Sequence, residues 1–511
     1  MEFSSEDLKQ IKRQGLTMEE ISRQLEDFTH GFPFMSVVKP ATVGDGIKKY
    51  DAEQTADLVK FYDDNKDGYS ITKFVPASGA ATRMMKDFYS FLSEYNDEKS
   101  TPVSEFKTIK QAIDNIDKFA FYDLLVNVMN DKGIALDDCL KKKNYKTIIE
   151  FIVTDKGLNY GKSPKAWITF HKDSQDKHLM TAFEQHLKEA AEYASSNKNA
   201  DIHFTVTEEH LPGFEKLKKE LLPVYENKYG LKYNITFSFQ EHSTDTIAVD
   251  TENNPIHDAD GHLVFRPAGH GSLITNLDKI DSDIIFIKNI DNISSCYAND
   301  TAYNKKLLAG VLIQTKQKIT SLMTKLKQRG LTKQDLVNIA RNITKHLNIT
   351  DIQDHTKFPT LTAYKQYLRE LINKPVRVCG MVRNTGEPGG GPYFVIRDGE
   401  TSLQIVETAQ MCNSDEKIKK IIASSTHFNP VDLVVSTKDW QQNKFKLSRF
   451  IDYQAGFITE KSFEGHPIKA MERPGLWNGA MAKWITIFVE VPLETFSPVK
   501  TLNDLLKKEH Q

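Results

Sequence analysis

Apolar runs of strand length recur along the first part of the chain and are separated by segments with helical periodicity. These strand-like runs lie at 71–75, 201–206, 235–240 and 284–287, and the first of them breaks at Pro76. Strands that alternate with helices through short polar turns favour a parallel sheet with helices packed on it. The pattern therefore predicts an α/β protein with a largely parallel sheet.

Three other blocks have the periodicity of helices. Residues 1–70 read as mostly helical and include a capping box in which Thr17 precedes Glu20 ahead of an apolar stripe. Residues 92–160 read as a helical insertion rich in Lys and Asp. Residues 296–374 contain three predicted helices, and we interpret this block as either a lid or a packing element.

Strand patterns return in the C-terminal part of the chain, at 376–382, 402–406 and 485–489. A loop rich in glycine and proline occupies 384–392, between the first two of these strands. Such a loop is either a sharp hairpin connection or a ligand-facing loop in which Glu387 is an acceptor. Both interpretations remain open from the sequence.

Composition narrows the class of protein. A chain of 511 residues with 39% hydrophobic and 27% charged residues is typical of a soluble protein with two or three domains. A net charge of −2 offers no general attraction to nucleic acid or to an anionic membrane. The four cysteines form no CxxC pair, and no signal core or long apolar run occurs. We expect a cytoplasmic protein without a membrane or nucleic-acid partner.

The strongest candidate for chemistry lies between residues 264 and 292. Pro267-Ala-Gly269-His270-Gly271 is a turn whose glycines let the backbone approach a flat ligand, with one imidazole available for hydrogen bonding. The apolar run at 284–287 leads into Asn289-Ile290-Asp291-Asn292. A carboxylate just past the carboxyl end of a central strand is where open α/β sheets hold ligands and metals. We interpret this stretch as the nucleotide and metal end of an active site.

A second candidate follows the strand at 71–75. Ser78-Gly79-Ala-Ala81-Thr82-Arg83 reads as a turn of small residues that leads into a helix with Arg83 in its first turn. Backbone N–H groups and a guanidinium in this arrangement bind phosphate. A tight strand-to-helix turn needs small residues for packing in any case, so a purely structural interpretation is equally open.

Isolated polar residues near strand ends are weaker candidates. Gln240 lies at the end of the strand at 235–240 and is either a contact to a base edge or an ordinary turn amide. Glu407 follows the strand at 402–406. Lys500 lies near the end of the sequence and, on local grounds alone, reads as an ordinary solvated lysine.

Taken in order, these motifs resemble the UDP-sugar pyrophosphorylases, especially the UDP-N-acetylhexosamine type. The turn at 78–83 and Pro164-Lys165 resemble the GGxGTR and PK elements of that family. The 267–271 loop resembles its base-binding PPGHG loop, and 289–292 resembles its NVDN strand end. The turn departs from the family by placing Ser78 and Ala81 at glycine positions.

The resemblance continues through the C-terminal part of the chain. Residues 405–408 and 428–430 resemble the VVEYSE and FNAGN segments that hold the sugar, and 495–500 resembles the EFSPLKN lysine segment. The whole chain also resembles a bacterial family described as domain of unknown function 4301, which shares the FRPxGHGxLIxNL and IKNIDN blocks.

The family resemblance implies a GT-A-like (Rossmann-like) nucleotide-diphospho-sugar transferase fold with a mixed, mostly parallel sheet and helical insertions. It implies transfer of a nucleotidyl group from an NTP, with uridine the expected base, to a sugar 1-phosphate, with Mg²⁺ as cofactor and pyrophosphate as product. The implied site residues are Arg83, Lys165 (with Lys86 as a substitute) and Lys500 for the phosphates; Ser78, Gly79, Thr82, Gln240, Gly269, His270 and Gly271 for the nucleotide; Glu407 and Asn429 for the sugar; and Asp291 for the metal. Glu387 lies in a loop with no counterpart in the family, and it is a further candidate for the sugar from the local pattern alone.

With this resemblance, the chain divides into four regions. They are an N-terminal helical region (1–70), a nucleotide-binding α/β core (71–295) with an insertion at about 92–160, a helical insertion (296–374), and a sugar-binding half with a C-terminal strand and a short helical tail (375–511).

Two other functions are compatible with the sequence. A glycosyltransferase of the same fold needs a DxD after a strand, whereas Asp281-Ser-Asp283 precedes the strand at 284–287. A non-catalytic protein that binds nucleotides or nucleotide sugars is supported by the altered glycine turn and the long insertions. The sequence does not identify the sugar or the oligomeric state.

Overall fold

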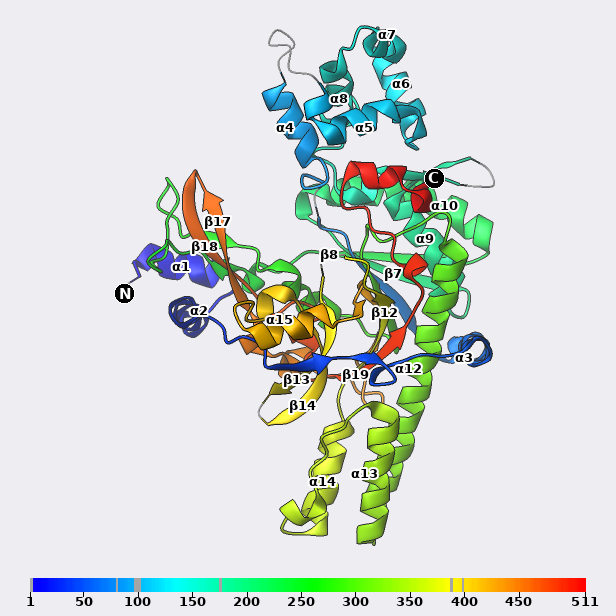
Figure 1. Cartoon of the computed structure of the whole chain (residues 1–511), viewed down its shortest axis with the longest axis vertical. Coiled ribbons are helices and arrows are strands. Elements are labelled where there is room, and N and C mark those ends of the chain that lie inside the picture. The colour runs from blue at the N-terminus through cyan, green and yellow to red at the C-terminus, as the bar shows by residue number, and fades with distance from the viewer. Residues whose placement is uncertain (1–2, 80, 96–102, 174–176, 387–388, 398) are drawn as a thin grey trace. The chain divides into compact units, whose positions relative to one another are not determined.

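The computed structural model of the chain (Figure 1) describes residues 3–79, 81–95, 103–173, 177–386, 389–397 and 399–511. These residues form two compact units, each assembled from three chain segments. The first unit comprises Met1–Ile71, Phe239–Ile287 and Lys306–Pro492. The second unit comprises Thr72–Ser238, Lys288–Lys305 and Leu493–Gln511.

The sheet of the first unit is mixed and mostly parallel. β12 (Val376–Arg383) pairs in parallel with β19 (Ile485–Glu490), and β19 pairs in parallel with β3 (Gly46–Lys48). In contrast, β12 and β16 (Asp432–Ser436) are antiparallel. Every residue of β11 and β16 is buried, which explains why these strands are apolar on both faces. In spatial order the strands are β2 (Thr42–Val43), β3 (Gly46–Lys48), β19 (Ile485–Glu490), β12 (Val376–Arg383), β16 (Asp432–Ser436) and β11 (Ile284–Lys288).

The second unit has a parallel arrangement of β4 (Ile71–Pro76), β7 (Asn199–Thr205) and β8 (Lys232–Ser238). The crossover from β7 to β8 is made by α10 (Leu211–Tyr229), while α9 (Ala182–Tyr193) precedes β7. Parallel neighbours need such helical crossovers. The prediction of an α/β protein with a largely parallel sheet is confirmed.

The predicted helical insertion at about 92–160 is confirmed as helical in the second unit. The last helix of this group, α8, buries Ile148, Ile149 and Ile152, and α8 packs against the first helix, α4. The helices of this group are α4 (Lys86–Glu94), α5 (Lys107–Asp114), α6 (Tyr122–Asp131), α7 (Leu136–Lys141) and α8 (Tyr145–Val153).

The N-terminal region is only partly helical. The capping box is present, since the Glu20 amide donates to Thr17 Oγ1 and the Thr17 amide donates to Glu20 Oε2. Three short strands follow that the sequence pattern did not predict. The first, β1 (Val37–Pro40), forms by pairing with the distant strand β13 (Gly391–Arg397), and such pairing is not visible in the local sequence. The elements here are α1 (Ser5–Arg13), α2 (Met18–His30), β1 (Val37–Pro40), β2, β3 and α3 (Ala52–Asn65).

The three helices expected within 296–374 are present as α12 (Ala298–Lys327), α13 (Lys333–Leu347) and α14 (Leu361–Ile372). In Figure 1, α13 and α14 lie side by side. Two antiparallel hairpins complete the first unit, β13 (Gly391–Arg397) with β14 (Glu400–Val406), and β17 (Phe457–Phe463) with β18 (His466–Glu472). Among the described residues, no helix combines the length and the apolar character that crossing a membrane requires.

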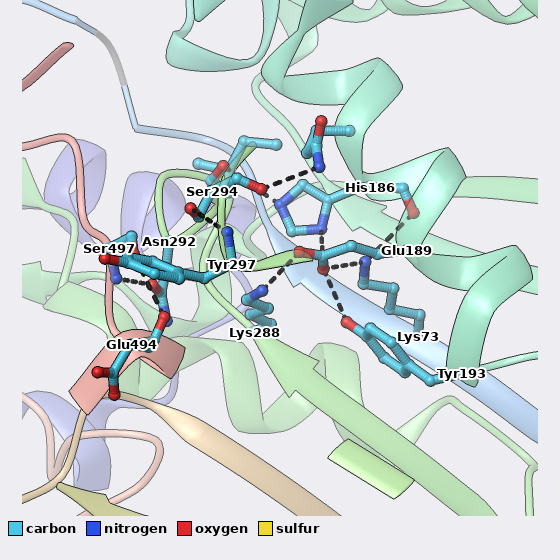
Figure 2. Close-up of polar contacts among 12 residues, drawn as sticks. Lys73, His186, Glu189, Tyr193, Lys288, Asn292, Ser294, Tyr297, Glu494 and Ser497 are labelled. Atoms are coloured by element: carbon cyan, nitrogen blue, oxygen red, sulfur yellow. Dashed lines mark hydrogen bonds and ion pairs between the residues drawn. The ribbon is translucent and has the colours of Figure 1, made fainter. Parts of the chain in front are cut away.

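A fully buried ion cluster lies in the second unit (Figure 2). Glu189 of α9 accepts from Lys73 Nζ at 2.8 Å, from Lys288 Nζ at 2.6 Å and from the Tyr193 hydroxyl at 2.8 Å. Burial acts to raise the pKa of Glu189, but Lys288 and Lys73 outweigh it and hold this pKa well below its ordinary value. Burial also lowers the pKa of Lys73 to about 8. Glu189 thus anchors lysines from two strands to one helix.

We predict that Glu189→Gln lowers the free energy of unfolding by about 3–5 kcal/mol, because it leaves two buried ammonium groups without their carboxylate. Urea denaturation of the full chain measures this change. Glu208→Gln, at an exposed site in the same unit, is the matched control and should change stability by no more than about 0.5 kcal/mol. Equal stability of the two variants would contradict the role assigned to Glu189.

Candidate functional site

An ion cluster at the end of β11 contains three of the predicted site residues. Asp291 Oδ2 accepts from Lys165 Nζ at 2.8 Å, and Lys500 Nζ lies 3.4 Å and 3.1 Å from Asp291 Oδ1 and Oδ2. Lys165 Nζ also donates to the Val499 carbonyl at 2.8 Å. The fold therefore joins three segments that are far apart in the sequence, all within the second unit.

The charges in this cluster favour an anion. Asp291 is 7% exposed, and its burial acts to raise its pKa, but Lys165 and Lys500 outweigh burial and leave the pKa lowered. Two ammonium groups share one carboxylate, so the cluster has excess positive charge. The Lys500 side chain is 59% exposed, whereas that of Lys165 is 12% exposed. The Lys500 ammonium is therefore accessible to an anion from solvent, whereas that of Lys165 is largely enclosed.

Backbone hydrogen bonds fix the lysine segment beside Asp291. The Val499 amide donates to the Asp291 carbonyl at 2.9 Å. Asn292 Oδ1 accepts from the Ser497 amide at 2.9 Å, as Figure 2 shows. The segment before Lys500 is thus held by two of its own amides, one on the Asp291 carbonyl and one on the Asn292 side chain, which explains why a lysine near the end of the sequence has a defined place.

Side chains of helix α9 support the end of β11, and Figure 2 shows Glu189 of this helix in contact with Lys288. Its buried side chains contact the chain just before and just after Asp291, so the loop is held by side chains from one rigid helix. These contacts are Glu189 with Lys288 at 2.6 Å, His186 Nε2 with the Ile290 carbonyl at 3.2 Å and Gln185 with the Ser294 carbonyl at 3.3 Å.

The turn at 78–83 lies against the segment that contains Lys165. The Ala81 amide donates to the Ser163 carbonyl at 3.2 Å, and the Lys165 amide donates to the Gly79 carbonyl at 3.4 Å. The two motifs are neighbours despite the helical insertion that separates them in the sequence. Ser78 is half-buried and Thr82 is exposed.

The expectation that Arg83 lies in the first turn of a helix is wrong. α4 begins at Lys86, and Arg83 is exposed in the turn before it. No side chain caps the helix at Met85, and the chain enters it through a turn over 81–85, so regular helix starts late. Within the described part of the chain, the Arg83 side chain forms no hydrogen bond or ion pair, which leaves it available to a ligand.

A second cluster is built around His270 in the first unit. The imidazole stacks on Trp477 with ring centroids 4.1 Å apart and planes 14° apart. Its Nδ1 accepts from the Leu476 amide at 3.0 Å, so the proton of the neutral ring resides on Nε2. Nε2 lies 3.9 Å from Glu407 Oε1, which also accepts from Asn478 Nδ2 at 2.6 Å. The fold thus brings His270 and Glu407 together.

Two glycines permit this arrangement. A Cβ on Gly475 would lie 2.4 Å from His270 Cε1, and a Cβ on Gly271 would lie 2.3 Å from the Pro474 carbonyl oxygen. Both distances are far below van der Waals contact. The close approach of the 267–271 loop to the 473–479 turn therefore requires glycine on each side.

Partial burial shifts the protonation of this cluster, in which the His270 and Glu407 side chains are 32% and 31% exposed. It lowers the pKa of His270 to about 4. It also raises the pKa of Glu407, an effect that the hydrogen bond from Asn478 partly opposes. His270 is thus a neutral imidazole at physiological pH and presents Nε2–H as a hydrogen-bond donor.

Asn429 lies beside the same cluster. Its amide donates to the Gly390 carbonyl at 2.8 Å, and a Cβ on Gly390 would lie 3.6 Å from Glu407 Cγ. Asn429 Oδ1 accepts from the amide of Val431 at 3.1 Å, which holds this β-branched residue at a φ of 60°. Such strain concentrates at functional sites. Asn429 Nδ2 is buried without a partner among the described residues and is available as a donor.

Of the remaining predicted residues, Gln240 is not bonded to this cluster, Gly269 adjoins His270 in the same loop, and Glu387 is not described. Gln240 donates to Asp245 Oδ1 at 3.4 Å, and among the described residues no hydrogen bond joins its side chain to the His270 cluster. This contact favours the ordinary turn amide over a contact to the base. Gly269 has a φ of 74°, and a Cβ there would meet Glu472 at 2.8 Å. Glu387 lies outside the described residues.

Trp477 and Asn478 belong to the site but were missed by reasoning from the sequence. They lie in Pro474-Gly475-Leu-Trp477-Asn478-Gly479, a turn between β18 and β19. A tryptophan between two glycines is a detectable signal, because a large ring in a tight turn needs a surface on which to pack.

The fold and the two clusters define an α/β protein with a mixed sheet, helical insertions and two polar sites built from distant segments. The chain belongs to the family described as "Domain of unknown function (DUF4301)", whose model matches residues 4–511. No curated protein matches the chain.

Solved structures of UDP-sugar pyrophosphorylases are similar to this chain. The uridine diphosphate N-acetylglucosamine pyrophosphorylase from Trypanosoma brucei is 11% identical, with 95% of this chain and 74% of that chain covered and a TM-score of 0.48. The UDP-glucose pyrophosphorylase from Leishmania major is 12% identical, with 99% and 79% covered and a TM-score of 0.45. At these identities and TM-scores, the likenesses do not assign an activity to this chain.

We predict that the His270 imidazole titrates near pH 4, because burial opposes its charged form. NMR of the histidine C–H resonances, with His270→Gln to identify the peak, measures this midpoint. The unfolded chain binds this proton more tightly, so His270 costs stability as pH falls from about 6.5 toward 4 and costs none at higher pH. A midpoint near 6.5 would contradict the buried, neutral assignment.

Proposed function

We propose that this protein is a sugar-1-phosphate nucleotidyltransferase of GT-A-like fold that forms a UDP-sugar from UTP and a sugar 1-phosphate. The observation that carries the proposal is the Lys165–Asp291–Lys500 cluster, which is basic overall and joins three motifs that resemble those of the pyrophosphorylases. The His270–Glu407 cluster supports the same function, because it joins the base-binding and sugar-binding motifs.

In the proposed reaction, a phosphate oxygen of the sugar 1-phosphate attacks the α-phosphorus of UTP. A new P–O bond forms, the bond from the α-phosphorus to the bridging oxygen breaks, and pyrophosphate leaves with that electron pair. The protein mainly aligns two anions and neutralises the developing charge. Lys165 and the exposed Arg83 would bind the triphosphate, and Lys500 would balance the phosphate of the sugar.

The His270 cluster offers the hydrogen-bonding groups that a nucleoside and a sugar need. The Nε2–H of His270 would donate to a carbonyl of the base, since Nδ1 is already occupied by the Leu476 amide. Glu407 would accept from sugar hydroxyls, and the unpartnered Nδ2 of Asn429 would donate to them.

Mg²⁺ is part of the proposal, and Asp291 is the residue that would hold it. The lowered pKa of Asp291 keeps the carboxylate charged, and Mg²⁺ is often held by one carboxylate together with substrate phosphates. Phosphates would draw the exposed Lys500 away from Asp291. When bound, Mg²⁺ would neutralise phosphate charge. The one group of three metal-ligand side chains in the described residues is Asp258, Asp260 and His262, at a separate site in the first unit.

A non-catalytic nucleotide-sugar binding protein is the second candidate, and the turn at 78–83 favours it. Ala81 is fully buried and its amide is bound to the Ser163 carbonyl. That amide is therefore not available to a phosphate. A glycosyltransferase is less well supported, because Asp281 and Asp283 precede β11 and form ion pairs with Lys438.

We predict pyrophosphate release when the protein is supplied with Mg²⁺, UTP and a matching member of a panel of sugar 1-phosphates. Asp291→Asn should lower kcat/KM by at least about a hundredfold, near 3 kcal/mol, because charge stabilisation is lost. The matched control is Asp300→Asn, an exposed aspartate of the same unit. Near-normal turnover of Asp291→Asn would refute the assignment of Asp291, and tight UDP-sugar binding without pyrophosphate release would establish the non-catalytic alternative.

We also predict that Glu407→Gln raises KM for the sugar 1-phosphate about tenfold and leaves KM for UTP nearly unchanged. A hydrogen bond from a hydroxyl to a charged acceptor contributes about 1.5–3 kcal/mol, part of which the amide loses. Glu460→Gln, at an exposed position of β17, controls for the loss of a carboxylate. Equal increases in both KM values would show that Glu407 does not act on the sugar.

A further inference from the structure

A cavity of about 350 Å³ lies in the first unit, away from the His270 cluster. It is lined by Lys374, just before β12, by Ile485 and Thr486, which begin β19, and by the Arg397 and Glu400 end of the β13–β14 hairpin. Glu407 follows the other end of that hairpin, where Gly391 pairs with Val406. The cavity and the His270 cluster are therefore at opposite ends of one hairpin, and the cavity is a separate site.

Charged side chains of both signs line this cavity: four cations (Lys374, Arg397, Arg449 and Lys483) and three carboxylates (Asp351, Glu400 and Asp452). Lys374, Arg449 and Lys483 line it, and none of the three forms an ion pair with an acidic side chain within the part of the chain described. Arg397 is paired with Asp452. Besides this pair, three cations face two carboxylates, Asp351 and Glu400, so one positive charge is left in excess.

Trp484 gives an independent indication of a ligand. It is 5% exposed and lines the cavity, yet its indole Nε1–H has no hydrogen-bond partner among the described residues. Buried donors are nearly always paired, so an unpaired one at a cavity wall indicates a missing acceptor. Burial also lowers the pKa of Lys374, and a bound anion would stabilise its charged form.

The lining also includes apolar side chains, among them Leu371, Val395, Leu403 and Phe450. Cavities of a few hundred Å³ that combine apolar walls with a few convergent polar groups are typical of small-molecule sites. The ligand that fits such a lining has an apolar or ring portion together with an acidic group.

We propose that this cavity binds a small organic anion, at a site distinct from the one assigned to the nucleotide and the sugar. The ammonium groups of Lys374 and Lys483 and the guanidinium of Arg449 bind the acidic group, and the Trp484 N–H donates to one of its acceptors. This inference does not depend on the proposed reaction.

Arg377 connects the cavity to the His270 cluster. Its fully buried guanidinium donates to Gln404 Oε1 at 3.3 Å and to Thr486 Oγ1 at 2.8 Å, and both of these residues line the cavity. It also donates to the Trp477 carbonyl at 2.6 Å. Arg377 thus bonds to two residues of the cavity lining and to the backbone of the residue that stacks on His270.

The test uses 8-anilinonaphthalene-1-sulfonate, a fluorescent aromatic anion, as the probe on the full-length protein. We expect saturable binding of one equivalent. Lys483→Glu should weaken it at least about tenfold by placing a negative charge beside the sulfonate. Trp484→Phe keeps an aromatic ring but removes the N–H, and should weaken binding about threefold to tenfold. Thermal unfolding of each variant checks that it is folded.

Matched controls distinguish this site from others. Lys417→Glu, at an exposed position of α15 (Glu416–Ala423), should leave probe affinity unchanged. The uncharged analogue N-phenyl-1-naphthylamine should bind at least about tenfold more weakly than the sulfonate. Equal binding of the two probes, or unchanged affinity in folded Lys483→Glu, would overturn the assignment of an anion site.

Discussion

The contact on which the proposed site most depends is that of Asp291 with two lysines. A nearly buried carboxylate is unfavourable by itself, and Lys165 and Lys500 keep it charged. Asp291 in turn holds Lys165 and Lys500, which are far apart in the sequence, within one cluster. The cluster is electrostatically incomplete, because one carboxylate does not neutralise two ammonium groups. In the proposed function, a substrate phosphate would supply the missing negative charge.

The support of this cluster is more deeply buried than the cluster itself. Glu189 pairs with Lys73 and Lys288 where water is excluded, and His186 of the same helix holds the chain next to Asp291. Rigid support of this kind lets a charged site keep its geometry before a ligand arrives. The His270 cluster achieves the same end by packing, since Gly271 and Gly475 allow an imidazole and an indole to stack closely.

Much of the fold and part of the site were predictable from the sequence. The strands that carry Asp291 and Glu407 have clear apolar patterns, and the motifs around Lys165, His270 and Lys500 have the order of a known family. Contacts that depend on tertiary packing were not predictable. Lys73 and Lys288 lie within apolar strands, and their pairing with Glu189 depends on a helix remote in sequence. Trp477 was missed because only its stacking on His270 gives it a role, and Arg83 was placed in a helix that starts three residues later.

The measurement that tests the account most directly is isotope exchange between labelled pyrophosphate and UTP in the presence of Mg²⁺ and UDP-sugars. It runs the proposed reaction in both directions and does not require the sugar 1-phosphate to be identified first. The account predicts that label enters UTP only when a matching UDP-sugar is present, and that Asp291→Asn abolishes the exchange. An active-site role for the Lys165–Asp291–Lys500 cluster would be contradicted if exchange occurred at an undiminished rate in that variant. The nucleotidyltransferase assignment itself would fail if no UDP-sugar or other nucleotide sugar supported exchange.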